Sequence, residues 1–105
     1  MRRQKEQNLT KDRSEKPVHP GEVIADILED LKISQIQFAE ILGVSHQIVN
    51  DLNQEKQPIT VDLAIRIGKA FGNGHQLWLN LQQKVDVWDA WKSSQVEYDR
   101  VLTVV

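Results

Sequence analysis

Cysteine is absent from this chain of 105 residues, which excludes disulfide bridges, thiolate metal sites and a cysteine nucleophile. No apolar run is long enough to cross a membrane. Polar residues rather than an apolar stretch follow Met1-Arg2-Arg3, so we expect no signal peptide. Together these absences predict a cytoplasmic protein without a membrane segment.

Sequence patterns of catalysis are also missing. The chain has no glycine-rich phosphate loop and no nucleophile signature. The three histidines, His19, His46 and His75, lie too far apart for the short ligand spacings of common zinc sites. The carboxylates between positions 22 and 30 follow helical spacing and are typical of a solvated helix face. We therefore predict no metal site, no cofactor and no enzyme activity.

Charge is distributed unevenly, although the net charge is only −2. Residues 1–16 hold six Lys or Arg against three Asp or Glu, a net +3, whereas the rest of the chain carries a net −5. Residues 1–16 are predicted to form a basic, flexible and disordered arm. A solvated tail would explain this segment, and additional phosphate contacts with DNA are the functional alternative.

Helical periodicity predicts one all-α domain over residues 17–93. The helix-breaking cluster at residues 17–21 is expected to precede the first helix. The predicted helices cover residues 22–31, 34–42, 45–52, 60–71 and 75–93. Residues 94–105 are rich in valine, and this C-terminal tail is predicted to be strand-like or disordered.

Residues 34–53 have the pattern of two short helices joined by a tight turn at Gly43, a helix-turn-helix. The second helix has Val49 and Leu52 on one face and small hydrogen-bonding side chains on the other. Such a helix can pack on its own domain and lie in the major groove of DNA.

Polar side chains in and beside this motif are the candidates for DNA contact. Gln and Asn can pair with the exposed edge of adenine, and Ser can bond several base edges. Side chains near a helix N-terminus or just after the motif can instead meet phosphates. The predicted DNA-binding residues are Gln35, Ser45, His46, Gln47, Asn50, Lys56 and Thr60.

Structural roles compete with these assignments. Ser34, Ser45 and Thr60 would be favoured as N-caps in any helical protein. The glutamines and Asn50 can be ordinary solvated residues. Ile48 is apolar where the helix is expected to face the groove, and it either contacts a thymine methyl group or packs at the edge of the core.

The run Gln35–Leu52 resembles the helix-turn-helix of the Cro/phage-repressor-like (XRE) superfamily. Over residues 17–93 the chain more narrowly resembles the HigA-type antitoxins, also called virulence-associated protein I. The runs that carry this resemblance are His19-Pro20-Gly21-Glu22, Leu42-Gly43-Val44-Ser45, Ile59-Thr60, Ala64-Ile65-Arg66-Ile67-Gly68-Lys69-Ala70-Phe71 and Leu77-Trp78-Leu79-Asn80-Leu81-Gln82.

The resemblance implies a five-helix, lambda-repressor-like fold and a homodimeric antitoxin of a type II toxin–antitoxin module. Such a protein binds double-stranded operator DNA, represses its own operon and neutralises a RelE-like mRNA interferase. Members of the family often carry Arg at the places of His46, Ile48 or Gln54, and Gly where Glu55 stands. The predicted recognition helix therefore has no formal positive charge, which weakens phosphate binding. The alternatives are an orphan XRE-type regulator and a toxin-binding module with little specific DNA binding.

The last predicted helix presents a tryptophan-rich face that either belongs to the core or contacts a partner. We predict a dimer or partner surface, because one small domain is not expected to bury both faces of so long a helix. Its candidate residues are Trp78, Val85, Trp88 and Trp91. The tail from Tyr98 onward could add a strand to a partner's sheet or simply fray.

Overall fold

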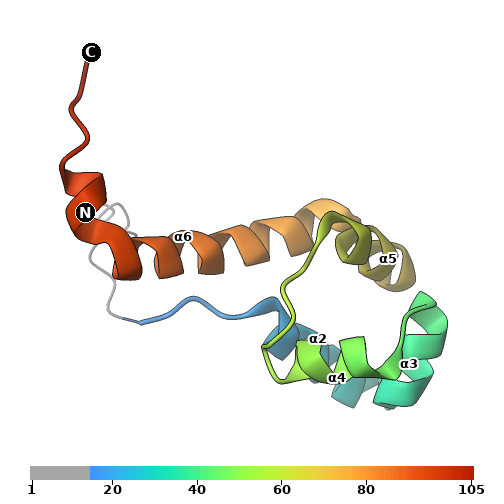
Figure 1. Ribbon diagram of the computed structural model, residues 1–105. Coiled ribbons are helices and arrows are strands. Elements are labelled where there is room, and N and C mark those ends of the chain that lie inside the picture. The colour runs from blue at the N-terminus through green and yellow to red at the C-terminus, as the bar shows by residue number, and fades with distance from the viewer. Residues whose placement is uncertain (1–14) are drawn as a thin grey trace, which may run out of the picture.

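The computed structural model describes residues 15–105, and these residues form five helices and no strand (Figure 1). The helices are α2 Pro20–Leu31, α3 Gln35–Leu42, α4 His46–Asn53, α5 Val61–Phe71 and α6 His75–Asp99. The all-α prediction is confirmed. The predicted arm lies outside the described residues except for its last two positions.

Helix α2 begins earlier than predicted, within the segment that was expected to break it. His19 is the N-cap residue, and its Nδ1 accepts a hydrogen bond of 2.9 Å from the Gly21 amide. Pro20 occupies the first helical position, where its fixed φ suits the helix and its missing N–H costs nothing. The expectation that residues 17–21 all precede the helix was therefore wrong, because a proline that interrupts a helix can also start one.

The three expected serine and threonine caps are present. Ser34 forms a capping box with Gln37, in which each side chain bonds the other residue's amide, at 3.0 Å and 2.8 Å. Ser45 accepts from the Ile48 amide at 3.3 Å, and Thr60 accepts from the Leu63 amide at 3.2 Å. These bonds satisfy amides that would otherwise lack partners and place the helix starts at fixed residues.

The core lies between α2–α4 on one side and the α5–α6 hairpin on the other, and aromatic rings join the two. Phe71 stacks on Phe38 with ring centroids 5.2 Å apart, and Trp78 tilts against Phe71 at 5.8 Å. Trp78 is fully buried, and its Nε1 donates to Asn73 Oδ1 at 3.1 Å. The other buried apolar residues are Ile24, Leu28, Ala39, Leu42, Val49, Leu52, Ile59, Leu63, Ala64, Ile67 and Val85.

Two residues of the predicted dimer or partner surface are therefore core residues. Trp78 and Val85 are 0% and 3% exposed within the single chain, so they cannot offer a surface to a partner. The prediction was wrong for them because the first half of α6 packs closely on α5, with the Gly68 backbone directly against Gly74 and His75. Trp88 is half-buried and Trp91 is 46% exposed, so only these two remain candidates.

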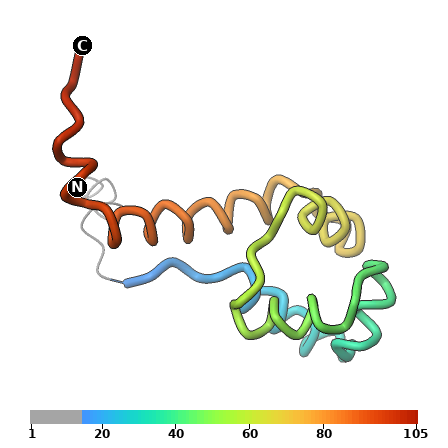
Figure 2. Tube along the Cα trace, in the orientation of Figure 1, coloured from blue at the N-terminus to red at the C-terminus, as the bar shows by residue number. Residues whose placement is uncertain are grey.

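Helix α6 is longer than predicted and extends beyond the body formed by the other helices (Figure 2). It has a kink at Ser94, where φ is −135°, and continues as a helix to Asp99. Trp91 and Tyr98 pack edge to face across this kink with centroids 5.1 Å apart. The prediction of a strand-like or disordered tail was wrong for residues 94–99, and residues 101–105 are exposed without regular secondary structure. No helix of the described residues is both long and apolar enough to span a membrane.

Candidate nucleic-acid interface

Helices α3 and α4 form the predicted helix-turn-helix. Gly43 ends α3 in the left-handed conformation, with φ at 74°, which turns the chain sharply toward Ser45. Val49 and Leu52 of α4 are both 0% exposed and fix the inner face of that helix. The opposite face therefore points away from the core.

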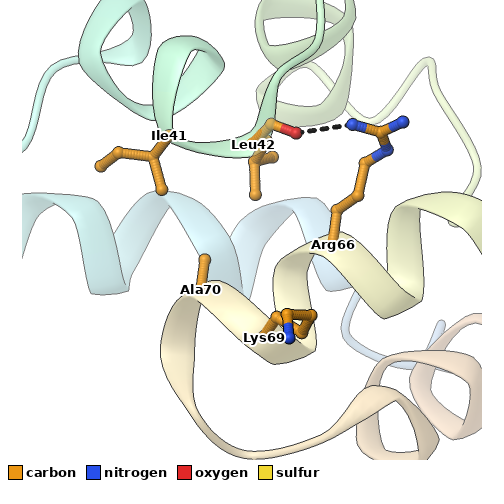
Figure 3. Close-up of a pocket in the computed structure, with 5 residues that line it drawn as sticks. All are labelled: Ile41, Leu42, Arg66, Lys69 and Ala70. Carbon is orange, nitrogen blue, oxygen red and sulfur yellow. Dashed lines mark hydrogen bonds between the residues drawn. The ribbon is translucent and has the colours of Figure 1, made fainter.

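Arg66 of α5 holds the turn at the N-terminal end of α4. Its Nη1 donates to the carbonyl oxygen of Leu42 at 2.8 Å, as Figure 3 shows. The same Nη1 donates to the Gly43 carbonyl oxygen at 3.3 Å, and Nε donates to Asp62 at 2.8 Å. These carbonyls lie at the negative end of the α3 dipole, where a cation is favourable. Arg66 thus ties the turn before the recognition helix to a different part of the chain.

Gly21 of α2 fixes the other end of α4. A Cβ atom at position 21 would overlap the Leu52 carbonyl oxygen, so the two helix backbones meet here without a side chain between them. The Leu52 carbonyl also accepts the Glu55 amide at 3.0 Å. The start of α2 therefore sets the position of the C-terminal end of α4.

The predicted DNA-binding residues lie around this anchored helix. Ser45, His46 and Gln47 are exposed at the N-terminal end of α4, and Asn50 is half-buried one turn further on. The oxygen of Ser45 serves as the cap and has a structural role whatever else it contacts.

The other three predicted contacts come from neighbouring segments. Gln35 is half-buried in the first turn of α3, and Thr60 is the exposed cap of α5. Lys56 is exposed in the loop after α4, where its amide donates to the Asp51 carbonyl at 2.8 Å. That bond places Lys56 beside the last turns of α4. Contact of these residues with DNA stays a prediction.

Asp51 is a neighbour of these residues that sequence reasoning missed. Gln47 Nε2 donates to Asp51 Oδ1 at 2.9 Å, so two side chains one turn apart on α4 form a pair. The spacing of four residues is the signal that could have revealed it. Helix α4 contains no Lys or Arg, so Asp51 gives its surface a negative charge.

The structure explains two unusual residues in and beside α4, Ile48 and Glu55. Ile48 is half-buried and packs against the core, which supports the second of its two predicted roles. Glu55 has a positive φ of 61°, a conformation that favours glycine. This positive φ explains why members of the resembled family often have glycine at this position.

An open pocket of about 270 Å³ lies in the seam between α3 and α5 (Figure 3). Its lining residues are Ile41, Leu42, Arg66, Lys69 and Ala70. Arg66 already bonds the Leu42 and Gly43 carbonyls and Asp62, so its guanidinium is largely occupied within the chain. Within residues 15–105 no three histidines or carboxylates lie close enough to hold a metal ion.

Comparison with known proteins places this geometry in a family. The helix-turn-helix family profile matches residues 24–78. Antitoxin HigA-1 of Vibrio cholerae is 35% identical over 83 residues, which cover 78% of each protein. A solved structure of a candidate antidote protein of a plasmid maintenance system from Nostoc punctiforme is 59% identical, with a TM-score of 0.76 over 87% of this chain and 100% of that one.

A further solved structure contains DNA. The antitoxin HigA of Pseudomonas aeruginosa, solved with the higBA promoter, has a TM-score of 0.80 and 33% identity over 86% of this chain and 100% of that one. Both the profile and these relatives describe DNA-binding regulators rather than enzymes. The chain therefore belongs to the helix-turn-helix family and, within it, to the HigA-type antitoxins of the XRE/Cro-like superfamily.

Proposed function

We propose that this chain is the antitoxin of a type II toxin–antitoxin module. As a homodimer in the cytoplasm it binds its operator through α4, represses its own operon and neutralises a RelE-like mRNA interferase. The observation that carries the DNA-binding part is the exposed polar N-terminal end of α4, which is anchored on both sides by Gly21 and Arg66. The HigA relative solved with promoter DNA supports the same assignment.

The anchored geometry suits reading of the major groove. A B-DNA major groove about 12 Å wide admits one α-helix, whose first residues then meet base edges. Gln47 and Asn50 supply amides, which can pair with adenine, while Ser45 and His46 supply shorter polar groups at the very start of the helix. Because α4 carries no Lys or Arg, positively charged contacts with phosphates must come from neighbouring segments such as Lys56.

Dimerisation compensates for the weak DNA binding expected of one α4 helix without Lys or Arg. Two recognition helices about one DNA turn apart, roughly 34 Å, bind two half-sites together. The outer half of α6 is the surface we assign to the dimer, because Trp91 and Val87 are each 46% exposed there. Trp88 is less available, since Lys16 and Lys92 lie over its ring at 5.7 Å and 5.2 Å. Sedimentation equilibrium should show a dimer that Trp91→Ala weakens, and a monomer at all concentrations would contradict this surface.

A gel shift with the DNA upstream of the chain's own operon tests the repressor function. We expect specific binding at low salt, with Gln47→Ala and Asn50→Ala each losing about tenfold in affinity. Gln76→Ala is a matched control, because Gln76 makes an equivalent side-chain bond to Asn80 on α6, away from α4. A folded wild-type protein that does not prefer this DNA to random duplex would refute the proposal.

The acidic recognition helix supports a second candidate, a toxin-binding module with little specific DNA binding. Asp51 and Glu55 both oppose the approach of phosphates to the end of α4. This candidate predicts tight binding of a small basic protein encoded by the adjacent gene and weak, sequence-independent DNA retention. A neighbouring operon without such a gene would instead favour an orphan regulator.

A further inference from the structure

The Gln47–Asp51 pair lies on the face of α4 that we propose meets DNA. Gln47 is exposed, Asp51 is half-buried, and their side chains are joined by a hydrogen bond of 2.9 Å. Neither residue belongs to the inner face, which Val49 and Leu52 occupy. The pair is therefore free to act on whatever approaches the helix.

The carboxylate fixes which end of the Gln47 amide faces it. An ionised carboxylate only accepts hydrogen bonds, so the nitrogen end of the amide must point toward Asp51. One N–H of Gln47 is used in this bond. The second N–H and the Oε1 oxygen remain available, so the amide still offers one donor and one acceptor.

That arrangement matches adenine better than guanine. In the major groove adenine presents the N6 amino donor beside the N7 acceptor, and a glutamine amide can bond both at once. Guanine presents two acceptors, O6 and N7, so the amide oxygen would face an acceptor. A glutamine without a carboxylate partner could turn and offer both of its N–H groups to guanine, but Gln47 has only one left to offer.

We infer that Asp51 is a positioning residue that makes Gln47 select adenine over guanine at one position of the operator. The inference rests on the proposed binding of DNA through α4. Asp51 also places a negative charge near the phosphates, so it lowers affinity for every duplex while it raises discrimination. Removing Asp51 should therefore raise the affinity for every duplex and lower the preference for adenine. A residue that only stabilised the helix would not produce these two opposite changes.

The test measures base preference and general affinity separately. Wild type, Asp51→Ala, Asp51→Asn and Gln47→Ala are compared for binding to operator duplexes that carry adenine or guanine at each position, and to random duplex. Gln47→Ala should lower the adenine-to-guanine ratio at one position by about tenfold. Asp51→Ala should lower the ratio at the same position by about threefold or more, while binding random duplex more tightly.

Two further variants make the result decisive. Asp51→Asn can donate to the Gln47 oxygen as well as accept from its nitrogen, so it no longer fixes the amide and should lose the adenine preference as Asp51→Ala does. Asn80→Ala breaks the analogous Gln76–Asn80 pair of 3.0 Å on α6 and should change neither quantity. An unchanged adenine-to-guanine ratio in Asp51→Ala, or a loss at a position that Gln47→Ala does not affect, would overturn the inference. A wild-type protein with no operator preference would refute the proposed DNA binding itself.

Discussion

Replacing Gly21 with alanine tests whether the start of α2 positions the recognition helix. The added Cβ would overlap the Leu52 carbonyl oxygen and lie 3.0 Å from the Leu52 carbonyl carbon and 3.1 Å from His19 Nδ1. Two of these three atoms belong to the backbone of α4, so no side-chain rotation relieves the overlap. Helices α2 and α4 would have to separate by more than roughly 1 Å to restore ordinary contact.

The expected loss of stability follows from that geometry. An extra methyl group in a packed core typically costs about 1–3 kcal/mol, because side chains leave their preferred rotamers and the backbone shifts. Because backbone must move here, we expect the upper end, about 3 kcal/mol of the free energy of unfolding. The same displacement moves the C-terminal end of α4, so affinity for the operator should fall as well.

Gly72→Ala is the matched control for this substitution. Gly72 has φ at 75°, and a Cβ there would meet no atom within 4 Å. Alanine at position 72 therefore suffers backbone strain alone, about 1 kcal/mol. Urea denaturation followed by circular dichroism gives both free energies, and a gel shift under native conditions gives operator affinity. If Gly21→Ala lowers the free energy of unfolding no more than Gly72→Ala, or leaves operator affinity unchanged, the contact between Gly21 and Leu52 does not position α4.

Three further substitutions test other contacts of the site. Glu55→Gly should raise the free energy of unfolding by about 0.5 kcal/mol, because glycine tolerates the positive φ at some cost in chain entropy. It should also tighten binding to any duplex in a gel shift, and weaker binding would contradict a role for its charge. Arg66→Ala should cost about 1–2 kcal/mol in urea denaturation through loss of its bonds to the Leu42 and Gly43 carbonyls, with partial rescue by Arg66→Lys. An effect below about 0.5 kcal/mol would show that water replaces the guanidinium. His19→Ala should cost about 1 kcal/mol as a lost N-cap, and recovery in His19→Asn would confirm capping as the cause.

The sequence alone could predict the parts of the fold that depend on local chemistry. The caps Ser34, Ser45 and Thr60 form within three residues of the amides they bond, so spacing alone identifies them. The inner face of α4 follows equally from the helical spacing of Val49 and Leu52. A glycine in the left-handed conformation was also predictable at position 43, directly after a short apolar helix.

The parts that depend on contacts between distant segments could not be predicted. Trp78 packs on Phe71 of α5, which itself stacks on Phe38 of α3, so its place in the core depends on two other helices and was wrongly predicted to be a partner surface. The valines at positions 96 and 101 favour strand, but helix α6 continues to Asp99, with Tyr98 packed on Trp91 across the kink. Neither the Arg66 bonds to the Leu42 and Gly43 carbonyls nor the Gly21 contact has a local signature, because each joins residues more than twenty positions apart.

These distant contacts show that segments outside the helix-turn-helix hold its second helix in place. Helix α4 has only eight residues, and an isolated helix of that length is unstable in water. Its position must therefore be imposed by packing, by the Gly21 backbone at one end and by Arg66 at the other. The turn and the polar residues of the motif determine which groups α4 can contact. Residues 19–21 and helix α5 determine the position of α4 in the fold. A substitution of Gly21 or Arg66 should therefore change the affinity for DNA, although neither residue is proposed to contact DNA. Gly21→Ala tests this effect.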